Sequence, residues 1–128
     1  MAERYKRYVT NVTAGVATEV YEAPNDGASG SAQSVIIGFL IASTSDDAGT
    51  VTIELFDFAT NGTGLTQKTF KLADTIPLPA DTSVDIIPGK FVVEHAGNNE
   101  GTPVLTGDIL KITSTKTCDV IISVVERV

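Results

Sequence analysis

Three short apolar runs, separated by turn-forming residues, close the chain. They span residues 91–93, 109–112 and 120–125, and the segments between them are rich in Gly, Asn, Ser and Thr. Short strands with connectors of this kind are typical of all-β sandwiches and barrels. The same pattern extends back to residue 5, and no segment interrupts it with a helix. The sequence therefore predicts an all-β fold with negligible helix.

The alternation of apolar and polar residues predicts which side chains form the core. Residues 34–42 are the most apolar run, and we expect a central strand there that is covered on both faces. Residues 51–58 alternate, which indicates a strand with one buried face. The predicted core residues are Val35, Ile37, Phe39, Ile41, Val51, Ile53, Leu55, Leu110, Ile112, Ile122 and Val124.

The number of strands limits how they can be packed. Residues 76–79 include Pro77 and Pro79, which cannot donate to a ladder, so this segment is predicted to be an edge or a crossover. We expect residues 84–87 and 90–94 to pair around Pro88-Gly89. About eight short strands in one sheet would leave an apolar face in water, whereas two packed sheets bury it. We predict a single domain over residues 1–128, a two-sheet, antiparallel, jelly-roll-like β-sandwich.

The composition argues against several classes of protein. The net charge is −7 and the isoelectric point is about 4.5, whereas a nucleic-acid binder needs a positive surface. No run approaches the roughly 20 apolar residues that span a bilayer, so we expect no membrane partner. The N-terminus lacks the apolar region of a signal peptide, and we expect synthesis in a cytoplasm.

The residues that most often carry chemistry are few. His95 is the single histidine, no nucleophile-elbow pattern is present, and we expect this side chain to be exposed or at an interface. Cys118 is the single cysteine and reads as a small, half-buried residue. The oxygen-rich loops at 25–26, 46–47 and 98–100 lack the spacing of an EF-hand and are interpreted as turns. We therefore predict no catalytic, cofactor-binding or metal-binding residue, no cofactor, and no enzymatic activity.

The N-terminal segment departs from the acidic background. Three of the nine basic residues fall within four positions, with two tyrosines beside them. Tyr and Arg are favoured at interfaces, so we name this cluster as the candidate interface and residues 1–12 as a possible assembly-contact strand. The partner would be an acidic surface or a neighbouring subunit's sheet. The alternative is a solvated edge strand that charge protects from pairing. The cluster consists of Arg4, Tyr5, Lys6, Arg7 and Tyr8.

Three segments resemble a known class of proteins. They are Ile-Pro-Leu-Pro-Ala-Asp-Thr-Ser at 76–83, Leu-Thr-Gly-Asp-Ile-Leu-Lys-Ile at 105–112, and the closing strand at 119–126. Together they are similar to the small β-sandwich virion proteins of tailed bacteriophages, above all capsid decoration (cement) proteins. The resemblance implies a non-enzymatic structural protein of the virion. It also implies a homo-oligomer, with a trimer favoured, that contacts the major capsid protein or other virion proteins.

Two other functions remain open. One is a phage tail, baseplate or fibre component, which the same resemblance allows. The other is a carbohydrate-binding β-sandwich module, which would stack sugars on exposed aromatic side chains. The chain has no Trp and three Tyr, and this deficit favours the structural role.

Overall fold

The structure is a computed structural model that describes residues 3–24, 32–57, 68–85, 90–95, 98–99, 102–103 and 107–127. Over these residues it contains strands and turns but no helix, as the sequence predicted. The strands are β1 (Glu3–Val12), β2 (Thr18–Glu22), β3 (Ala32–Ser43), β4 (Gly49–Asp57), β5 (Lys68–Leu78), β6 (Ser83–Asp85), β7 (Phe91–His95), β8 (Asn98–Asn99), β9 (Thr102–Pro103), β10 (Ile109–Ser114) and β11 (Cys118–Arg127).

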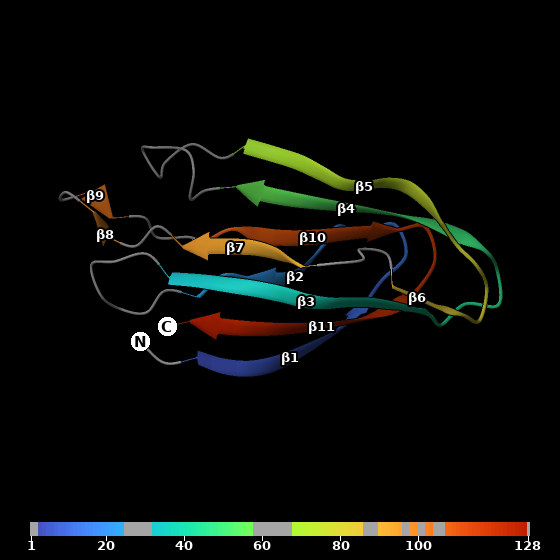
Figure 1. Cartoon of the computed structure of the whole chain (residues 1–128). Helices are drawn as coiled ribbons and strands as arrows, with labels where there is room; N and C mark the ends of the chain where they lie inside the picture. Colours follow the sequence, from blue (N-terminus) through green and yellow to red (C-terminus); the bar gives the residue numbers. More distant parts are fainter. Residues whose placement is uncertain are drawn as a thin grey trace.

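Two antiparallel sheets form the sandwich (Figure 1). The first sheet has the order β1-β11-β3-β6, with β7 also on β3, and the second has the order β2-β10-β4-β5. Strands β8 and β9 pair only with each other. The first strand of the chain thus pairs with the last, the second with the last but one, and β4 with β5. This nested order is that of a jelly roll, and the two-sheet, all-β prediction is confirmed.

The described parts of the two segments on either side of Pro88-Gly89 do not pair with each other, which corrects the expectation for 84–87 and 90–94, while residues 86–89 lie outside the described residues. Strand β6 pairs with β3 at Leu40–Ala42, and β7 pairs with β3 at Ala32–Ile36. Strands β6 and β7 therefore lie end to end along the same edge of β3, because the twelve residues of β3 are long enough to pair with both. The proline-containing segment does lie in an edge strand, since β5 ends the second sheet.

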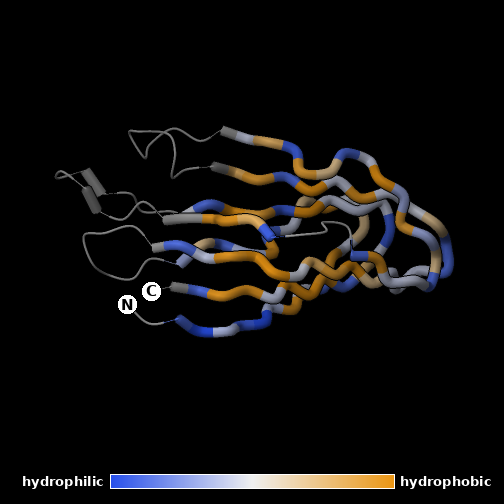
Figure 2. Tube along the Cα trace, in the orientation of Figure 1, coloured by the Kyte–Doolittle hydropathy of each residue, from blue (hydrophilic) through white to orange (hydrophobic). Residues whose placement is uncertain are grey.

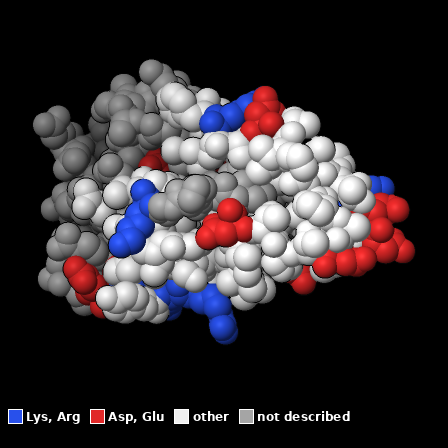
Figure 3. Space-filling model, turned by 45° about the vertical axis from the view of Figure 1, so that its right-hand side comes forward, with Lys and Arg blue, Asp and Glu red and all other residues white. Residues whose placement is uncertain are grey.

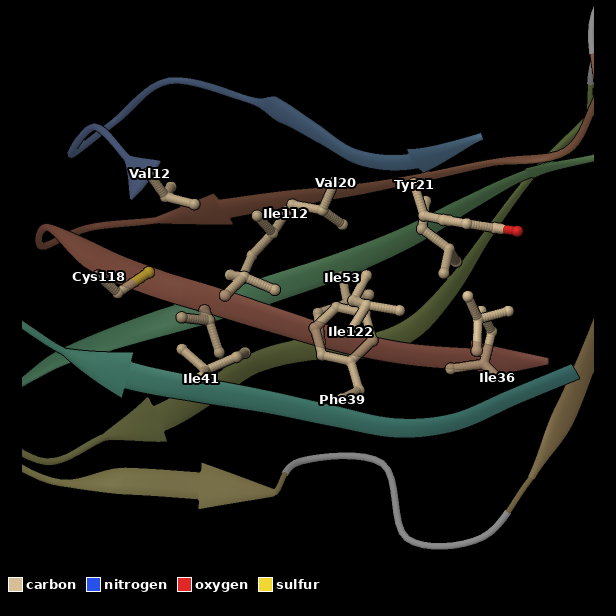
Figure 4. Packing of buried hydrophobic residues seen from close by; sticks show 14 of the residues in the cluster. Val12, Val20, Tyr21, Ile36, Phe39, Ile41, Ile53, Ile112, Cys118 and Ile122 are labelled. Carbon is tan, nitrogen blue, oxygen red and sulfur yellow. The ribbon is translucent and has the colours of Figure 1, made fainter. Parts of the chain in front are cut away.

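The core lies between the two sheets and consists mainly of Val, Ile and Leu (Figure 4). Of the predicted core residues, eight are buried, while Leu55 and Val35 are partly buried. The buried eight are Phe39, Ile41, Val51, Ile53, Leu110, Ile112, Ile122 and Val124.

Ile37 was predicted to be buried, and this prediction is wrong. Its side chain is 41% exposed, because β3 contains a bulge. Val124 of β11 pairs with Ile36, whereas the preceding Ser123 pairs with Gly38, so Ile37 is an extra residue. The extra residue reverses the alternation, and Ile36 and Phe39 both face the core. Strand β3 is consequently covered on one face only, not on both.

The Gly-Asp step of the 105–112 segment has a structural cause. A Cβ atom at Gly107 would collide with the backbone carbonyl oxygen of Ala23. The neighbouring ladder requires this close approach, because the Ala23 amide donates a hydrogen bond of 2.9 Å to the Asp108 carbonyl oxygen. Only glycine can occupy such a site without displacing the backbone. This residue therefore fixes how β10 begins beside the end of β2.

The bulge predicts opposite outcomes at two adjacent isoleucines. Ile36→Ala should lower the free energy of unfolding by about 2–5 kcal/mol, as truncation of a buried isoleucine does. Ile37→Ala should lower it by about 1 kcal/mol or less, because most of that side chain already meets water. Urea denaturation of both variants measures the difference. Equal losses, or a larger loss at Ile37, would show that the alternation continues through β3 without a bulge.

Candidate assembly interface

Strand β1, which carries the candidate interface residues, is an integral part of the first sheet. It pairs with β11 at every position from Glu3↔Arg127 to Val12↔Cys118. Alternation along the strand divides the basic and aromatic cluster between the two faces of the sheet. Arg4, Lys6 and Tyr8 lie on the core-facing side of the strand, where Arg4 and Tyr8 contact Glu126, whereas Tyr5 and Arg7 lie on the outward side. The predicted cluster is thus divided between the two faces of the sheet, although the Arg4 side chain is still 47% exposed at the edge.

Arg4 and Tyr8 belong to a buried polar cluster centred on Glu126, which the sequence did not reveal. Glu126 is fully buried. Its Oε1 accepts a 2.8 Å hydrogen bond from Arg4 Nε, and its Oε2 accepts bonds of 2.8 Å from the Tyr8 hydroxyl and 2.7 Å from the Tyr21 hydroxyl. The Tyr21 oxygen also lies 3.0 Å from Ser34 Oγ. The two tyrosine rings meet edge to face, with centroids 5.2 Å apart.

The ionisation states of this cluster follow from its contacts. Burial by itself raises the pKa of Glu126, but the hydrogen bonds from Tyr21, Tyr8 and Arg4 outweigh it and hold the pKa below its ordinary value. Burial, together with the bond to Glu126, raises the pKa of Tyr8 to about 12 and raises that of Tyr21 further. At neutral pH the carboxylate is therefore charged and both phenols are protonated. The cluster acts as a clamp that joins β11 to β1 and β2.

The outer face of the first sheet, the face away from the core, is unusually apolar. The register places Tyr5, Val125, Val35 and Val92 in one row across four strands. A second row contains Val9, Ile121 and Leu40. Five of the eight large hydrophobic side chains that are exposed in the described part of the chain lie here. These five are Tyr5 (79% exposed), Val9 (59%), Ile37 (41%), Leu40 (36%) and Val92 (50%).

The outer face of the second sheet has the opposite character. A single row across its four strands reads Glu19, Lys111, Glu54 and Lys71, so that each charge has the opposite charge as its cross-strand neighbour. Lys111 also lies over the Phe56 ring, 4.6 Å from its centroid. A face that alternates charge in this way is suited to water. The outer face of the first sheet is therefore the candidate interface.

Hydropathy and charge along the strands show the same division. In Figure 2 the N-terminal half of β1 is hydrophilic, while long stretches of β3 and β11 are hydrophobic. In Figure 3 one group of Lys and Arg side chains lies at the lower rim and others lie elsewhere on the view, while acidic side chains gather at the right-hand end and also lie near the centre. Much of the remaining surface in this view is uncharged. The apolar surface thus has a basic border along β1.

His95 and Cys118 cannot form a joint site. His95 pairs with Ala32 and Cys118 pairs with Ser43, at opposite ends of β3. These two positions are eleven residue steps apart along β3, about 36 Å at roughly 3.3 Å per residue. Cys118 is fully buried rather than half-buried, and burial raises the pKa of its thiol, which disfavours the nucleophilic thiolate. The side chain of His95 lies outside the described residues.

The described part of the chain also bears on the predictions about metal sites and membrane spans. That part contains no group of three His, Cys, Asp or Glu side chains placed to hold a metal ion. The loop at 25–26 lies outside it. Nor does that part include a helix of the length and apolarity needed to cross a bilayer.

The fold is similar to that of proteins from virus particles. The chain aligns over 97% of its length with a structure of infectious bursal disease virus, Gx strain, at 19% identity and a TM-score of 0.56. It aligns over 96% with T=1 particles derived from the same virus, at 20% identity and 0.53, and over 97% with its VP2 subviral particle, at 18% identity and 0.51. The chain spans about a third of the length of these proteins. No protein family model and no curated protein matches it.

The clamp predicts a defined dependence of stability on pH. Because the folded-state pKa of Glu126 is depressed, its contribution is present above the unfolded-state value of about 4.3 and is lost as pH falls through the folded value. Glu126→Gln and Tyr21→Phe should each cost about 1–3 kcal/mol at pH 7, because each leaves a buried polar group unpaired. The Gln variant should also lose part of the decline below pH 4.3. Urea denaturation from pH 7 to 3 tests both points, and an unchanged acid decline in Glu126→Gln would contradict the assignment.

Proposed function

We propose that the chain is a structural protein of a tailed bacteriophage virion that decorates or cements the outer capsid surface. The observation that carries the proposal is the contrast between the two outer faces of the sandwich. One face carries an alternating row of charges and is suited to water, whereas the other exposes five large apolar side chains. Soluble monomeric proteins rarely expose a large contiguous apolar surface, so a surface of this kind marks an interaction site.

The fold supports a role in a particle. The chain is a jelly roll over nearly its whole described length, and the solved structures that it resembles come from virus particles. The resemblance of segments 76–83, 105–112 and 119–126 to phage decoration proteins gives the finer assignment. In this role the protein would be a homo-oligomer, a trimer by that resemblance, with its partner the major capsid protein. Several weak contacts per oligomer would act together to hold it on the particle.

The basic border of the apolar face adds an electrostatic component to this binding. Arg7 is exposed on the outward side of β1 beside Tyr5, whereas Lys6 lies on the core-facing side and Arg4 is held by Glu126. An acidic capsid surface would attract Arg7, and salt would screen that attraction. Deleting residues 1–8 would not isolate this electrostatic contribution to capsid binding, because the deletion also removes the hydrogen bonds of Arg4 and Tyr8 to the buried Glu126 carboxylate.

The same apolar face would also suit a tail, baseplate or fibre component that binds a different virion protein. The location of the protein on the particle distinguishes this role from capsid decoration. A carbohydrate-binding module is less well supported. Among the described aromatic side chains, Tyr8 and Tyr21 are held by Glu126, and the strongly exposed Tyr5 and Phe70 lie on different sheets. They do not form the common stacking platform that a sugar ring needs.

Two equally exposed apolar residues provide a matched test of the interface. Val92 in the first sheet and Phe70 in the second are each 50% exposed, but Phe70 lies opposite Leu55, which packs against the core, so urea denaturation must first confirm that both lysine variants are folded. Val92→Lys should reduce binding to capsids that lack this protein by tenfold or more, as does burial of an unpaired charge in an interface, whereas Phe70→Lys should bind normally. Co-sedimentation with such capsids measures both. Normal binding by Val92→Lys, or equal losses in both variants, would remove this face from the proposal.

A further inference from the structure

Two strand edges on one side of the sandwich carry opposite charges. Strand β1 ends the first sheet and β2 ends the second, and each is the lowest strand of its sheet in Figure 1. Strand β1 contains Arg4, Lys6 and Arg7 with one acidic residue, a net charge of +2. Strand β2 contains Glu19 and Glu22 with no basic residue, a net charge of −2. The two edges of this side therefore complement each other.

The opposite side of the sandwich is poorly suited to pairing. There β5 contains Pro77, two register shifts, and Thr75 with a φ of 52°, which a β-branched residue rarely adopts. On the same side, the edge of the first sheet consists of two short strands, β6 and β7. Strand β1, by contrast, pairs with β11 over ten residues without a register shift, and no other strand in the described part of the chain pairs with its second edge. Such an edge is a template for another strand.

The two charged edges lie level with one another along the strands. The rings of Tyr8 and Tyr21 meet edge to face with centroids 5.2 Å apart, so the two tyrosines lie at a similar height along β1 and β2. The two strands run in opposite directions, so Arg7, before Tyr8, is level with Glu22, after Tyr21. Both residues are exposed and occupy outward positions of their sheets, opposite Ser123 and Ile109 respectively.

We propose that a second copy of this chain pairs along this side, with β1 of each copy forming an antiparallel ladder with β2 of the other. A twofold axis parallel to the strands exchanges the two sheets and preserves the height and direction of every strand. It therefore brings Arg7 of one copy beside Glu22 of its partner, twice per dimer. The first sheet of each copy continues into the second sheet of the other.

The charges select this partner over others. Lys and Arg on an edge strand discourage pairing with neutral or basic strands, including a second β1, because like charges directly opposite one another repel. An acidic edge removes that penalty, and β2 supplies one in every copy. The contact leaves both outer faces uncovered. If the proposed trimer forms through another surface and its axis meets this twofold axis, the two contacts together would produce a hexamer.

Charge exchange tests the contact in solution, without a capsid, so that its failure and the failure of particle binding are distinguishable. The unmodified chain should sediment as a dimer or hexamer. Arg7→Glu and Glu22→Arg should each weaken the twofold contact by about ten- to a hundredfold, because each replaces two attractions with two repulsions. An equal mixture of the two variants should restore it, since only the mixed pair places opposite charges together. Lys71→Glu, on the outer face of the second sheet, is the matched control and should behave as the unmodified chain.

Covalent trapping provides a second measurement. A chain with both Arg7→Cys and Glu22→Cys should form a disulfide-linked dimer on oxidation, while either substitution alone should not. The natural Cys118 is buried and should not interfere. A monomer or strict trimer in sedimentation, failure of the mixture to restore association, or equal cross-linking in the single variants would each overturn the proposal.

Discussion

The carboxylate of Glu126 is the interaction on which the arrangement of strands at one side of this sandwich depends. It lies near the end of β11, and its hydrogen-bond donors come from β1 and β2, while Ser34 of β3 contacts Tyr21. A buried carboxylate without donors would cost several kcal/mol, so these strands must come together around it. Breaking one contact leaves the others under-satisfied, which makes the cluster a constraint on geometry as much as a source of stability.

The contacts to Glu126 explain how β1 can both stabilise the fold and carry residues of the proposed assembly surfaces. Alternation along β1 directs Arg4 and Tyr8 to the carboxylate and leaves Tyr5 and Arg7 facing outward. The inward residues hold the strand in register with β11, and that register determines where the outward residues appear. The level of Arg7 relative to Glu22 likewise depends on the contact between Tyr8 and Tyr21. The clamp thus positions the surfaces that we propose for assembly.

The outer faces of the two sheets differ in polarity. The second sheet carries an alternating row of charges across its outer face, which keeps that face in water. The first sheet carries a bulge at Ile37 that turns an additional isoleucine outward beside Leu40 and Val92. One inserted residue therefore keeps the core filled by Ile36 and Phe39 and also enlarges the apolar outer face.

The sequence by itself determined the fold class, the single core of aliphatic residues and the edge position of the proline-containing strand, because period-two alternation and proline are local signals. It also singled out residues 4–8 as unusual. Tertiary structure alone decided that Ile37 faces outward, that β6 and β7 share one edge of β3, and that Arg4 and Tyr8 serve a buried carboxylate. A bulge is defined by its partner strand, and Glu126 near the end of an apolar run looks like an ordinary exposed residue until the strands that satisfy it, more than a hundred residues away in the chain, are folded beside it.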